Sequence, residues 1–578
     1  MSKQNKKSKG SVTFGPFSGI DARTPHTGIS SAADVVNFRP GKDGSLIKRC
    51  GYHYLFPLSA PIRAAWTGKL FGTTYIILAE GSYVERINPK TNARLTIGVL
   101  PGSVKTKLQF CYYRDRLYLF SECGIYEVGE KSITPVEGYV PLIGKNWTST
   151  YVGEVFEPRN LLTRRARIEY VIEEYASVFL RTKWSVESIQ AIYQNDTLVD
   201  SEKYFYDDNS QTIILQDMKE GDQIRVYLTY AEDTEPETAA QLRSCGHIDV
   251  FGDSANNRLF CWDGNQKNLF FVSTHVSAES LTASKHCSSS SVPLYFPEHC
   301  QCVLGDGRYD ITGFVRQFNH LLIFTEGDTW TLDTEALSQP NFSAKPMHPL
   351  LGCATVGAYA MAENAPITVG LTDVYQWDTN TEEYNECAAR IISDPIRSLP
   401  EKSFFPSARI FHYRTMGEVW FYAPDVSESI WIYRIADGLW YRFSGFSPDI
   451  FFEVEDRLYF GSGANLYVFD DDFCEDTDSK NIAHPILATY TSGIFDYNTP
   501  HEKHFSDLYL SADCNGGTIR VSLLGDGLGE ITCDFSDTDK HTVAHCRLSS
   551  GRFRYASLQI VADGTSRQVI HSLVSEVR

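Results

Sequence analysis

Residues 111–120 read Cys111-Tyr-Tyr-Arg-Asp-Arg-Leu-Tyr-Leu-Phe120, and residues 122–126 read Glu122-Cys-Gly-Ile-Tyr126. Apolar and polar side chains alternate around a short polar turn, which is the pattern of a β-hairpin. The pattern returns three times further along the chain, at residues 312–332, 417–433 and 451–469. The recurring element is therefore an aromatic-rich pair of short strands.

Similar hairpins that return along one chain are typical of a β-propeller, in which each blade covers its faces with its neighbours. We predict about six to eight blades. The repeated residues are core-forming aromatic and aliphatic types, not acids, bases or metal ligands, so the repeat indicates a scaffold.

Length and composition agree with a large all-β protein. The chain has 578 residues, of which 42% are hydrophobic and 13% aromatic. This length predicts two to four domains, and the abundance of Tyr and Phe favours sheets. Helical periodicity is scarce, and the segment at residues 238–244 is the clearest helical candidate. No run of about 18 apolar residues occurs, so we expect no membrane span.

Shifts in pattern divide the chain into five sections. Residues 1–60 are irregular and rich in Gly and Pro, which predicts an extended N-terminal arm. Residues 61–163 form the first part of the propeller, which resumes at residues 236–470. Residues 164–235 carry their own strands and turns, which predicts an inserted immunoglobulin-like β-sandwich. Residues 480–578 alternate as a C-terminal β-sandwich.

The formal net charge of −19 argues against a surface built to grip DNA. An acidic channel through which DNA passes without adhering remains compatible with this charge, since like charges repel. The first ten residues are basic, with four lysines, and lack the apolar core of a secretory signal. A solvated tail is the simpler interpretation, and a phosphate-binding arm is the alternative.

Fourteen cysteines occur without the spacing of a disulfide framework. Cys111, Cys261 and Cys353 fall inside strand patterns, where a thiol acts as a small apolar group. In the absence of an export signal, we expect a reducing cytosol and free thiols.

The search for chemistry yields no strong motif. The sequence contains no nucleophile elbow, phosphate loop, H-E-x-x-H or C-x-x-C pattern. His299-Cys300-Gln-Cys302 is spaced more tightly than zinc ligands usually are, and we interpret it as a structural strand. The acidic run at residues 470–478 lacks the calcium-loop pattern and is interpreted as a solvated linker. Three Asp-Gly pairs are interpreted as turns that tolerate positive φ, at residues 306–307, 437–438 and 526–527.

We therefore predict that the chain is not an enzyme and has no catalytic residue, cofactor or metal site. A propeller glycosidase is the enzymatic alternative, because carboxylates can converge at the mouth of a propeller channel. A pair of carboxylates at the separation that glycoside hydrolysis needs cannot be recognised across blades from sequence.

The opening segment resembles the start of a family of bacteriophage virion proteins. In that family a G-x-D opening precedes an A-x-N segment and a G-x-L-x-x-R-x-G segment. Cys50 stands where the pattern often has proline or another small residue, so the local turn is expected to differ. The matching positions in this chain are Gly19 and Asp21, Ala33 with Asn37, and Gly44, Leu46, Arg49 and Gly51.

Further segments follow in the order found in the family. Each of them is short, but together they touch nearly the whole chain, and their order supports the resemblance. They are residues 157–163 before the insert, 204–209 and 220–227 within it, 311–318 and 438–443 in the propeller, and 491–497 with Lys503 at the entry to the C-terminal domain.

The resemblance is to the packaged-DNA stabilisation proteins and tail nozzles of short-tailed phages. It implies a ring of identical copies, usually a homohexamer, below the portal and adaptor proteins. Such a ring continues the channel for double-stranded DNA without sequence-specific binding, retains the packaged DNA and takes part in its ejection. It also implies contacts with tail fibres or tail-tip proteins, and a location in the virion after synthesis in the host cytoplasm.

For the arm, the resemblance implies assembly contacts with a neighbouring subunit. The residues themselves leave an alternative, in which the glycines permit turns and Arg49 pairs with a carboxylate of its own domain. A second functional interpretation is a tail-tip or baseplate protein that binds a host receptor or fibres. The arm residues implied in assembly are Gly19, Asp21, Arg23, Asn37, Arg49 and Gly51.

Overall fold

The computed structural model describes residues 10–24, 31–102, 108–145, 155–173, 178–253, 256–276, 294–333, 343–378, 389–496, 500–526, 530–536 and 543–577. Strands dominate these residues, which confirms the predicted all-β class. The segment expected to be helical forms α1 (Glu237–Arg243). The expectation of a solvated tail at residues 1–9 lies outside the described residues. The other short helices among the described residues are η2 (Ser201–Lys203), η3 (Glu232–Thr234), η5 (Asp394–Ile396) and α3 (Phe404–Ser407).

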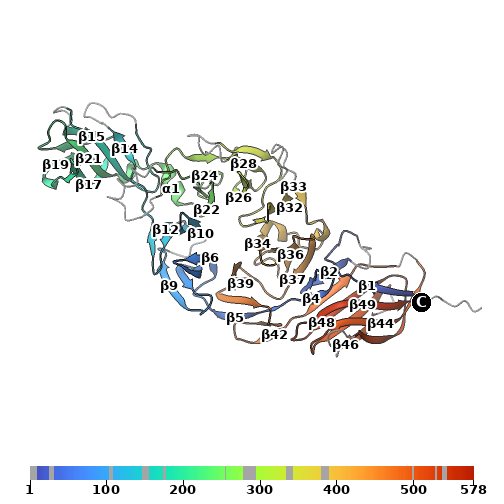
Figure 1. Ribbon diagram of the computed structural model, residues 1–578. Coiled ribbons are helices and arrows are strands. Elements are labelled where there is room, and N and C mark those ends of the chain that lie inside the picture. The colour runs from blue at the N-terminus through green and yellow to red at the C-terminus, as the bar shows by residue number, and fades with distance from the viewer. Residues whose placement is uncertain are drawn as a thin grey trace, which may run out of the picture.

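In the described part of the chain, seven antiparallel sets of four strands are arranged in a ring (Figure 1). Seven blades lie within the predicted range of six to eight. Six blades use four consecutive strands each. These are β6–β9 (Ile62–Leu70, Thr73–Glu80, Tyr83–Ile87, Arg94–Val99), β10–β13 (Leu108–Tyr113, Arg116–Ser121, Gly124–Val128, Ile133–Pro135), β22–β25 (His247–Phe251, Arg258–Trp262, Leu269–Val272, Gln301–Val303), β26–β29 (Ile311–Gln317, His320–Thr325, Thr329–Asp333, Lys345–His348), β30–β33 (Tyr359–Ala362, Ala365–Val369, Val374–Trp377, Ala389–Ile391) and β34–β37 (Arg409–Tyr413, Glu418–Tyr422, Ile430–Arg434, Leu439–Phe443).

The seventh blade joins the two ends of the propeller. Three of its strands are consecutive, and the fourth is β5 (Gly51–Pro57), which precedes the first blade in sequence. β5 pairs antiparallel with β40, from Gly51 opposite Asp470 to Pro57 opposite Asn465. The ring is therefore closed by hydrogen bonds between segments more than 400 residues apart. The three consecutive strands are β38 (Ile450–Val454), β39 (Arg457–Ser462) and β40 (Asn465–Asp470).

Aromatic side chains fill the spaces between blades, among them Phe314 and Phe324 of a recurring hairpin, as predicted. Trp262 of the third blade stacks on Phe314 of the fourth, with ring centroids 5.5 Å apart. Phe324 of the fourth blade contacts Trp377 of the fifth at 5.3 Å. These rings are buried, so they contribute apolar burial as well as aromatic contacts to the blade interfaces.

The insert between the second and third blades is a two-sheet sandwich with its own hydrophobic core, which includes Ile168, Leu180 and Val226. Its sheet begins before residue 164, because the strand at residues 142–145 pairs parallel with β15. A strand of four residues carries too little alternation to reveal that pairing from sequence. The five-stranded sheet is β14 (Leu142–Lys145), β15 (Arg165–Val171), β21 (Gln223–Tyr230), β17 (Val186–Gln194) and β18 (Thr197–Leu198), and the other sheet is β16 (Phe179–Arg181), β20 (Thr212–Leu215) and β19 (Tyr204–Asp207).

The opening segment, predicted as an extended N-terminal arm, is paired with other parts of its own chain. Its described residues form short strands that pair with strands of the propeller and of the C-terminal domain. Three of these strands have only three to five residues and partners several hundred residues away, so their pairing leaves no local pattern in the sequence. The first four strands are β1 (Gly10–Phe14), β2 (Ala32–Val36), β3 (Phe38–Pro40) and β4 (Leu46–Lys48).

The C-terminal domain shares a sheet with the propeller. β2 pairs parallel with β37 of the sixth blade and antiparallel with β43, so a nine-stranded sheet runs from the blade into the sandwich. β1 and β4 pair with β49 in the facing sheet. The remaining strands are β43 (Ala488–Ser492), β48 (Ala556–Asp563), β45 (Thr518–Gly525) and β46 (Glu530–Phe535) in the shared sheet, β44 (Lys503–Asp513), β47 (Val543–Phe553) and β49 (Val569–Val577) in the facing sheet, and the hairpin β41 (Glu475–Thr477) with β42 (Ala483–Pro485).

One pair of cysteines corrects the expectation of free thiols. Cys533 of β46 and Cys546 of β47 form a disulfide, and these strands are edges of the two facing sheets. No spacing motif marks this pair, because the bond depends on the packing of one sheet on the other. Ten other cysteines among the described residues are free thiols.

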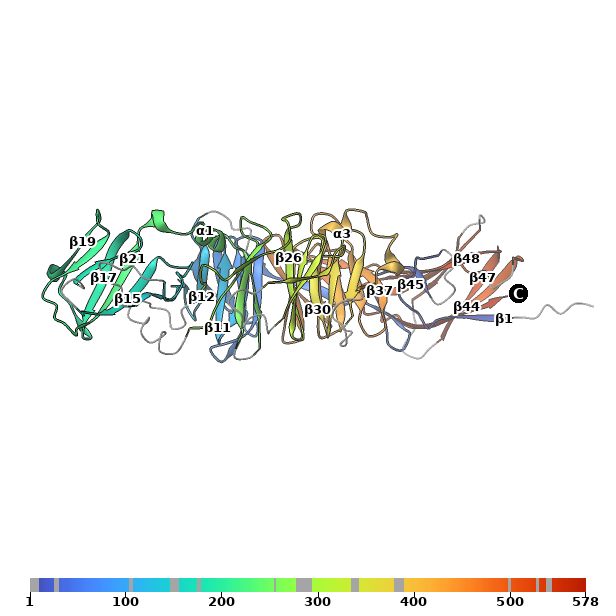
Figure 2. The ribbon, with the colours of Figure 1, turned by 90° about the horizontal axis from the view of Figure 1, so that it is seen from above.

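The two sandwiches lie at opposite sides of the ring (Figure 1). Seen from above, the insert, the propeller and the C-terminal sandwich form one flat, elongated array (Figure 2). Among the described residues, no helix has both the length and the apolar character needed to cross a membrane.

Candidate functional site

Arg49, predicted as an arm residue, is buried at the junction of the propeller with the C-terminal sandwich. Its guanidinium donates from Nη1 to Asp476 Oδ1 at 2.8 Å and from Nη2 to the backbone carbonyl of Ser444 at 3.2 Å. The guanidinium also lies over the ring of Phe446 at 5.3 Å. The side chain of Arg49 is 1% exposed, so its charge is balanced within the chain by Asp476.

Asn37 completes this network. Its Oδ1 accepts from Arg49 Nε at 3.0 Å and from the backbone N–H of Ser444 at 2.9 Å, and its Nδ2 donates to the carbonyl of Leu487 at 2.8 Å. The backbone of Asn37 has φ of 55°, a left-handed conformation that asparagine tolerates better than most residues. Asn37 therefore connects the arm, the sixth blade and the start of β43.

Two glycines of the arm motif allow close approach of backbones. A Cβ atom at Gly51 would lie 1.9 Å from the carbonyl oxygen of Glu475, and one at Gly19 would lie 2.6 Å from the carbonyl oxygen of Trp440. Neither distance is compatible with a side chain. These glycines are therefore required by packing within the chain, not by turn conformation.

Asp21 and Arg23 differ from the other motif residues because they lie nearer the surface, with Asp21 half-buried and Arg23 exposed. Arg23 donates from Nε to Asp21 Oδ1 at 2.8 Å and from Nη2 to Oδ2 at 2.7 Å. These hydrogen bonds lower the pKa of the Asp21 carboxyl group. Arg23 remains 59% exposed at its side chain, and its assembly role stays a prediction.

The junction contains two further ion pairs that the sequence did not point to. Asp34 of β2 accepts from Arg442 Nε of β37 at 2.9 Å. Arg39 of β3 has its Nε 2.8 Å from Glu418 Oε1 of β35. Glu418 is fully buried. Each pair joins the arm to the sixth blade, and the partners are about 400 residues apart in the chain.

The acidic run at residues 470–478 is only in part the solvated linker that we predicted. Asp476 is the buried partner of Arg49. Asp478 accepts from the backbone N–H groups of Lys480 at 2.8 Å and Ile482 at 2.9 Å, which lowers the pKa of its carboxyl group. The run therefore contains a structural ion pair and a turn.

A second junction connects the insert to the propeller. Asn160 is buried, and its Nδ2 donates to the carbonyls of Tyr139 and Leu294, both at 2.9 Å. Its Oδ1 accepts from the backbone N–H groups of Phe296 at 3.0 Å and Leu162 at 3.2 Å. Asn160 belongs to the family-like segment 157–163, and this contact set assigns it a structural role.

Arg159 reinforces the same junction. It donates from Nε to Glu298 Oε2 at 3.1 Å and from Nη1 to the carbonyl of Thr234 at 2.7 Å. Its guanidinium lies over the ring of Trp184 at 4.3 Å. One side chain therefore contacts the propeller side, the exit linker and the insert.

The ring closure contains a buried pair of carboxylates. Glu80 Oε2 accepts from the backbone N–H of Ser59 at 2.7 Å, next to the closing strand β5. Arg94 Nη2 lies 3.7 Å from Glu80 Oε1 and 2.7 Å from Glu85 Oε2, and Arg94 Nη1 donates to the carbonyl of Pro57 at 2.8 Å. Burial, with Glu85 nearby, raises the pKa of Glu80 to about 7.

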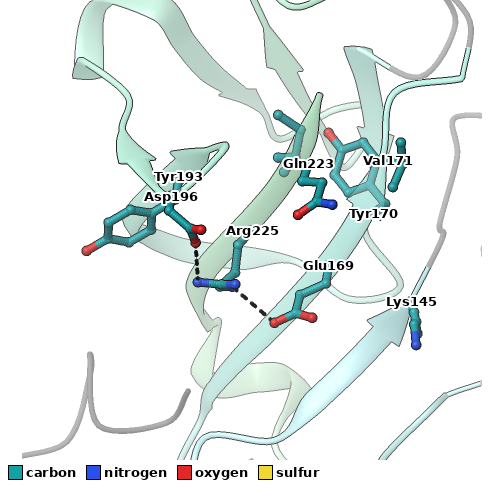
Figure 3. Close-up of a pocket in the computed structure, with 9 residues that line it drawn as sticks. Lys145, Glu169, Tyr170, Val171, Tyr193, Asp196, Gln223 and Arg225 are labelled. Atoms are coloured by element: carbon teal, nitrogen blue, oxygen red, sulfur yellow. Dashed lines mark hydrogen bonds and ion pairs between the residues drawn. The ribbon is translucent and has the colours of Figure 1, made fainter. Parts of the chain in front are cut away.

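The outward face of the insert contains a polar pocket of about 140 Å³ (Figure 3). Arg225 lies in its middle, with Nε 3.1 Å from Glu169 Oε1 and Nη1 3.3 Å from Asp196 Oδ1. The rest of the pocket wall includes Lys145, Tyr193 and Gln223, which lie around Arg225 and its two carboxylate partners. No local pattern in the sequence marks this site, because its residues come from four strands and a turn.

The motifs considered for metal or catalysis have structural surroundings. Cys302 lies in β25, and burial raises the pKa of the neighbouring Cys300 thiol to about 11. Gly307 and Gly438 have φ of +80° and +70°, which confirms two of the predicted Asp-Gly turns, and Gly527 lies outside the described residues. Within the described ranges, no group of three or more His, Cys, Asp or Glu side chains could hold a metal ion.

Comparisons with known proteins leave the family open. No protein-family model matches the chain, and no curated protein matches it. Among the solved structures, a chain of the "Crystal Structure of Mitotic Checkpoint Complex" matches with a TM-score of 0.33 and 8% identity, over 68% of this chain and 86% of that chain. A likeness this low carries no argument about function.

Proposed function

We propose that this protein is a structural component of a bacteriophage tail, which forms a ring below the portal and adaptor, continues the DNA channel and retains the packaged DNA. Its contacts would be with copies of itself, with portal or adaptor proteins and with tail fibres or tail-tip proteins. In this proposal six copies of the chain form the ring, because the tail nozzles that the sequence resembles are usually homohexamers.

The main support for the proposal is the position of the arm-motif residues in the fold. Gly19, Asn37, Arg49 and Gly51 were singled out by their order in the sequence, and all four lie where the arm contacts the propeller or the C-terminal sandwich. A motif that maintains the architecture is expected to persist among proteins that share that architecture. This placement supports the resemblance, which otherwise rests on short segments.

The proposed mechanism is mechanical and electrostatic. A chain with a net charge of −19 would present acidic surfaces to DNA, so that DNA passes without tight binding. Retention requires a constriction formed by loops of the ring, and release requires a rearrangement of subunits. A channel of strongly basic character in the assembled ring would contradict this mechanism.

Reconstitution tests the proposal. The purified full-length chain is mixed with a portal–adaptor complex and studied by mass photometry and electron microscopy. We expect a closed ring on the distal face of the adaptor. A chain that stays monomeric in the presence of the complex would overturn the proposal. Density found only at the distal tip of intact particles would favour the tail-tip alternative instead.

A further inference from the structure

The pocket on the insert is built by one row of side chains that crosses four strands. Lys145 is the register partner of Glu169, Glu169 of Arg225, and Arg225 of Tyr193. Directly opposed residues in a sheet project from the same face. The four side chains therefore stand next to one another on one face.

This row has no role in the core of the sandwich. The core is formed by the alternating residues of the same strands, among them Ile168, Val226 and Ile192. Strand alternation places those residues on the opposite face. The polar row is consequently available to a ligand at the surface, and the cavity of about 140 Å³ has room for a group the size of one sugar ring.

The row alternates hydrogen-bond donors and acceptors at fixed positions. Arg225 is held between Glu169 and Asp196 by its two hydrogen bonds (Figure 3). Lys145 and Gln223 add donors at one side of the pocket, and Tyr193 adds an aromatic ring at the other. Neighbouring hydroxyl groups of a sugar donate and accept hydrogen bonds in the same alternation.

The charge balance near the pocket is positive. Glu169 Oε1 lies 3.2 Å from Arg167 Nε as well as 3.1 Å from Arg225 Nε, so one carboxylate faces two guanidinium groups. Arg167 is 3% exposed, and its Nη1 makes no hydrogen bond. Lys145 lines the same pocket, so three cations lie in this region beside the two carboxylates of Glu169 and Asp196. A ligand with a negative charge is therefore favoured over a neutral one.

We propose that this pocket binds a saccharide unit that carries a carboxylate, such as a uronic acid residue of a polysaccharide. Lys145 and Arg225 contact the carboxylate, Glu169 and Asp196 accept from hydroxyl groups, and Tyr193 packs against the sugar ring. The assignment does not rest on the proposed tail function, and ring assembly can fail or succeed independently of it.

Ligand-observed NMR titration of the full-length chain tests the site. The probes are methyl glucuronide, methyl glucoside and inorganic phosphate. We expect saturable binding of the glucuronide, weaker binding of the glucoside and poor competition by phosphate. Full displacement of the glucuronide by phosphate, with no response to the glucoside, would identify a simple anion site and overturn the saccharide assignment.

A matched pair of lysine variants locates the binding. Lys145 lies over the ring of Phe156 at 5.5 Å, and Lys183 lies over the ring of Trp184 at 5.1 Å, outside the pocket. Lys145→Met is expected to weaken glucuronide binding about tenfold, the size of one charge-assisted hydrogen bond, and to leave glucoside binding unchanged. Lys183→Met should change neither. Equal losses in the two variants, or no saturable response in the parent chain, would refute the site.

Discussion

The two sandwiches of this protein are attached to the propeller in different ways. The C-terminal sandwich continues a propeller sheet through β2, and its apolar side chains, such as Leu510 and Ile560, belong to the same hydrophobic core as Trp420 of the sixth blade. The insert keeps a separate core, and its linkers contact the propeller through polar side chains such as Asn160 and Arg159.

Because the two sandwiches are attached differently, a destabilising substitution at each junction should affect the stability of the domains differently. A continuous sheet and core make the C-terminal sandwich and the propeller one cooperative unit, so a defect at their junction should destabilise both. A separate core allows the insert to stay folded when its junction weakens, since units of stability follow contiguous packing. The predictions below separate these two modes of attachment, from the largest effect to the smallest.

The largest effect is expected for Arg49→Met. The substitution leaves Asp476 buried without its partner, which typically costs about 3–5 kcal/mol. Hydrogen exchange measured at increasing urea concentrations should show the propeller and the C-terminal sandwich losing stability together. A loss confined to one of them would contradict the shared unit.

A smaller effect is expected from pH at the ring closure, where the pKa of Glu80 is raised to about 7. An acid whose pKa is higher in the folded state than in the unfolded state stabilises the fold below its unfolded pKa, and that contribution is lost as the pH rises through 7. We expect the free energy of unfolding to fall by about 2 kcal/mol between pH 4.5 and pH 7.5, less than the full shift implies because solvent around the partly exposed Arg94 screens the site.

Glu80→Gln is the control for this pH dependence, because it keeps the shape and removes the titration. The variant should show a flatter stability profile over the same range in urea titrations. An unchanged slope would assign the pH dependence to other groups.

Asn160→Ala should affect the insert junction alone. It removes four hydrogen bonds at buried groups, and we expect a local loss of about 1–2 kcal/mol. Hydrogen exchange should become faster at Leu162 and Phe296, while β15 and β21 inside the insert keep their protection. Asn209→Ala, at an exposed turn of the insert, is the matched control. Loss of protection throughout the insert would contradict an independent core.

Arg23→Met should have the smallest effect on stability. Its ion pair with Asp21 is exposed, and such pairs contribute less than about 1 kcal/mol. Unfolding of the variant should match the parent chain, in contrast to Arg49→Met. If Arg23 forms an assembly contact, the variant will instead weaken ring formation, which mass photometry measures.

Elements with local alternation could be predicted closely. The hairpin predicted at residues 111–126 forms β10, β11 and β12, and the segment expected to be helical at residues 238–244 forms α1. Strands whose hydrogen-bonding partners are far away in the sequence could not be predicted in this way. β2 and β4 are too short for a pattern, and β46, β47 and β49 became apparent only in the folded sandwich. The pocket around Arg225 depends on register between strands, which a linear pattern does not contain.

The sequence by itself determined that this chain forms repeated aromatic hairpins, an inserted set of strands and an acidic surface, because alternation, turn residues and charge are local properties. Only the tertiary structure decided that β5 closes the ring, that Arg49 meets Asp476, and that the opening segment joins two domains. These contacts connect residues more than 400 positions apart. They form because burial of apolar side chains brings the segments together and buried charges then require partners.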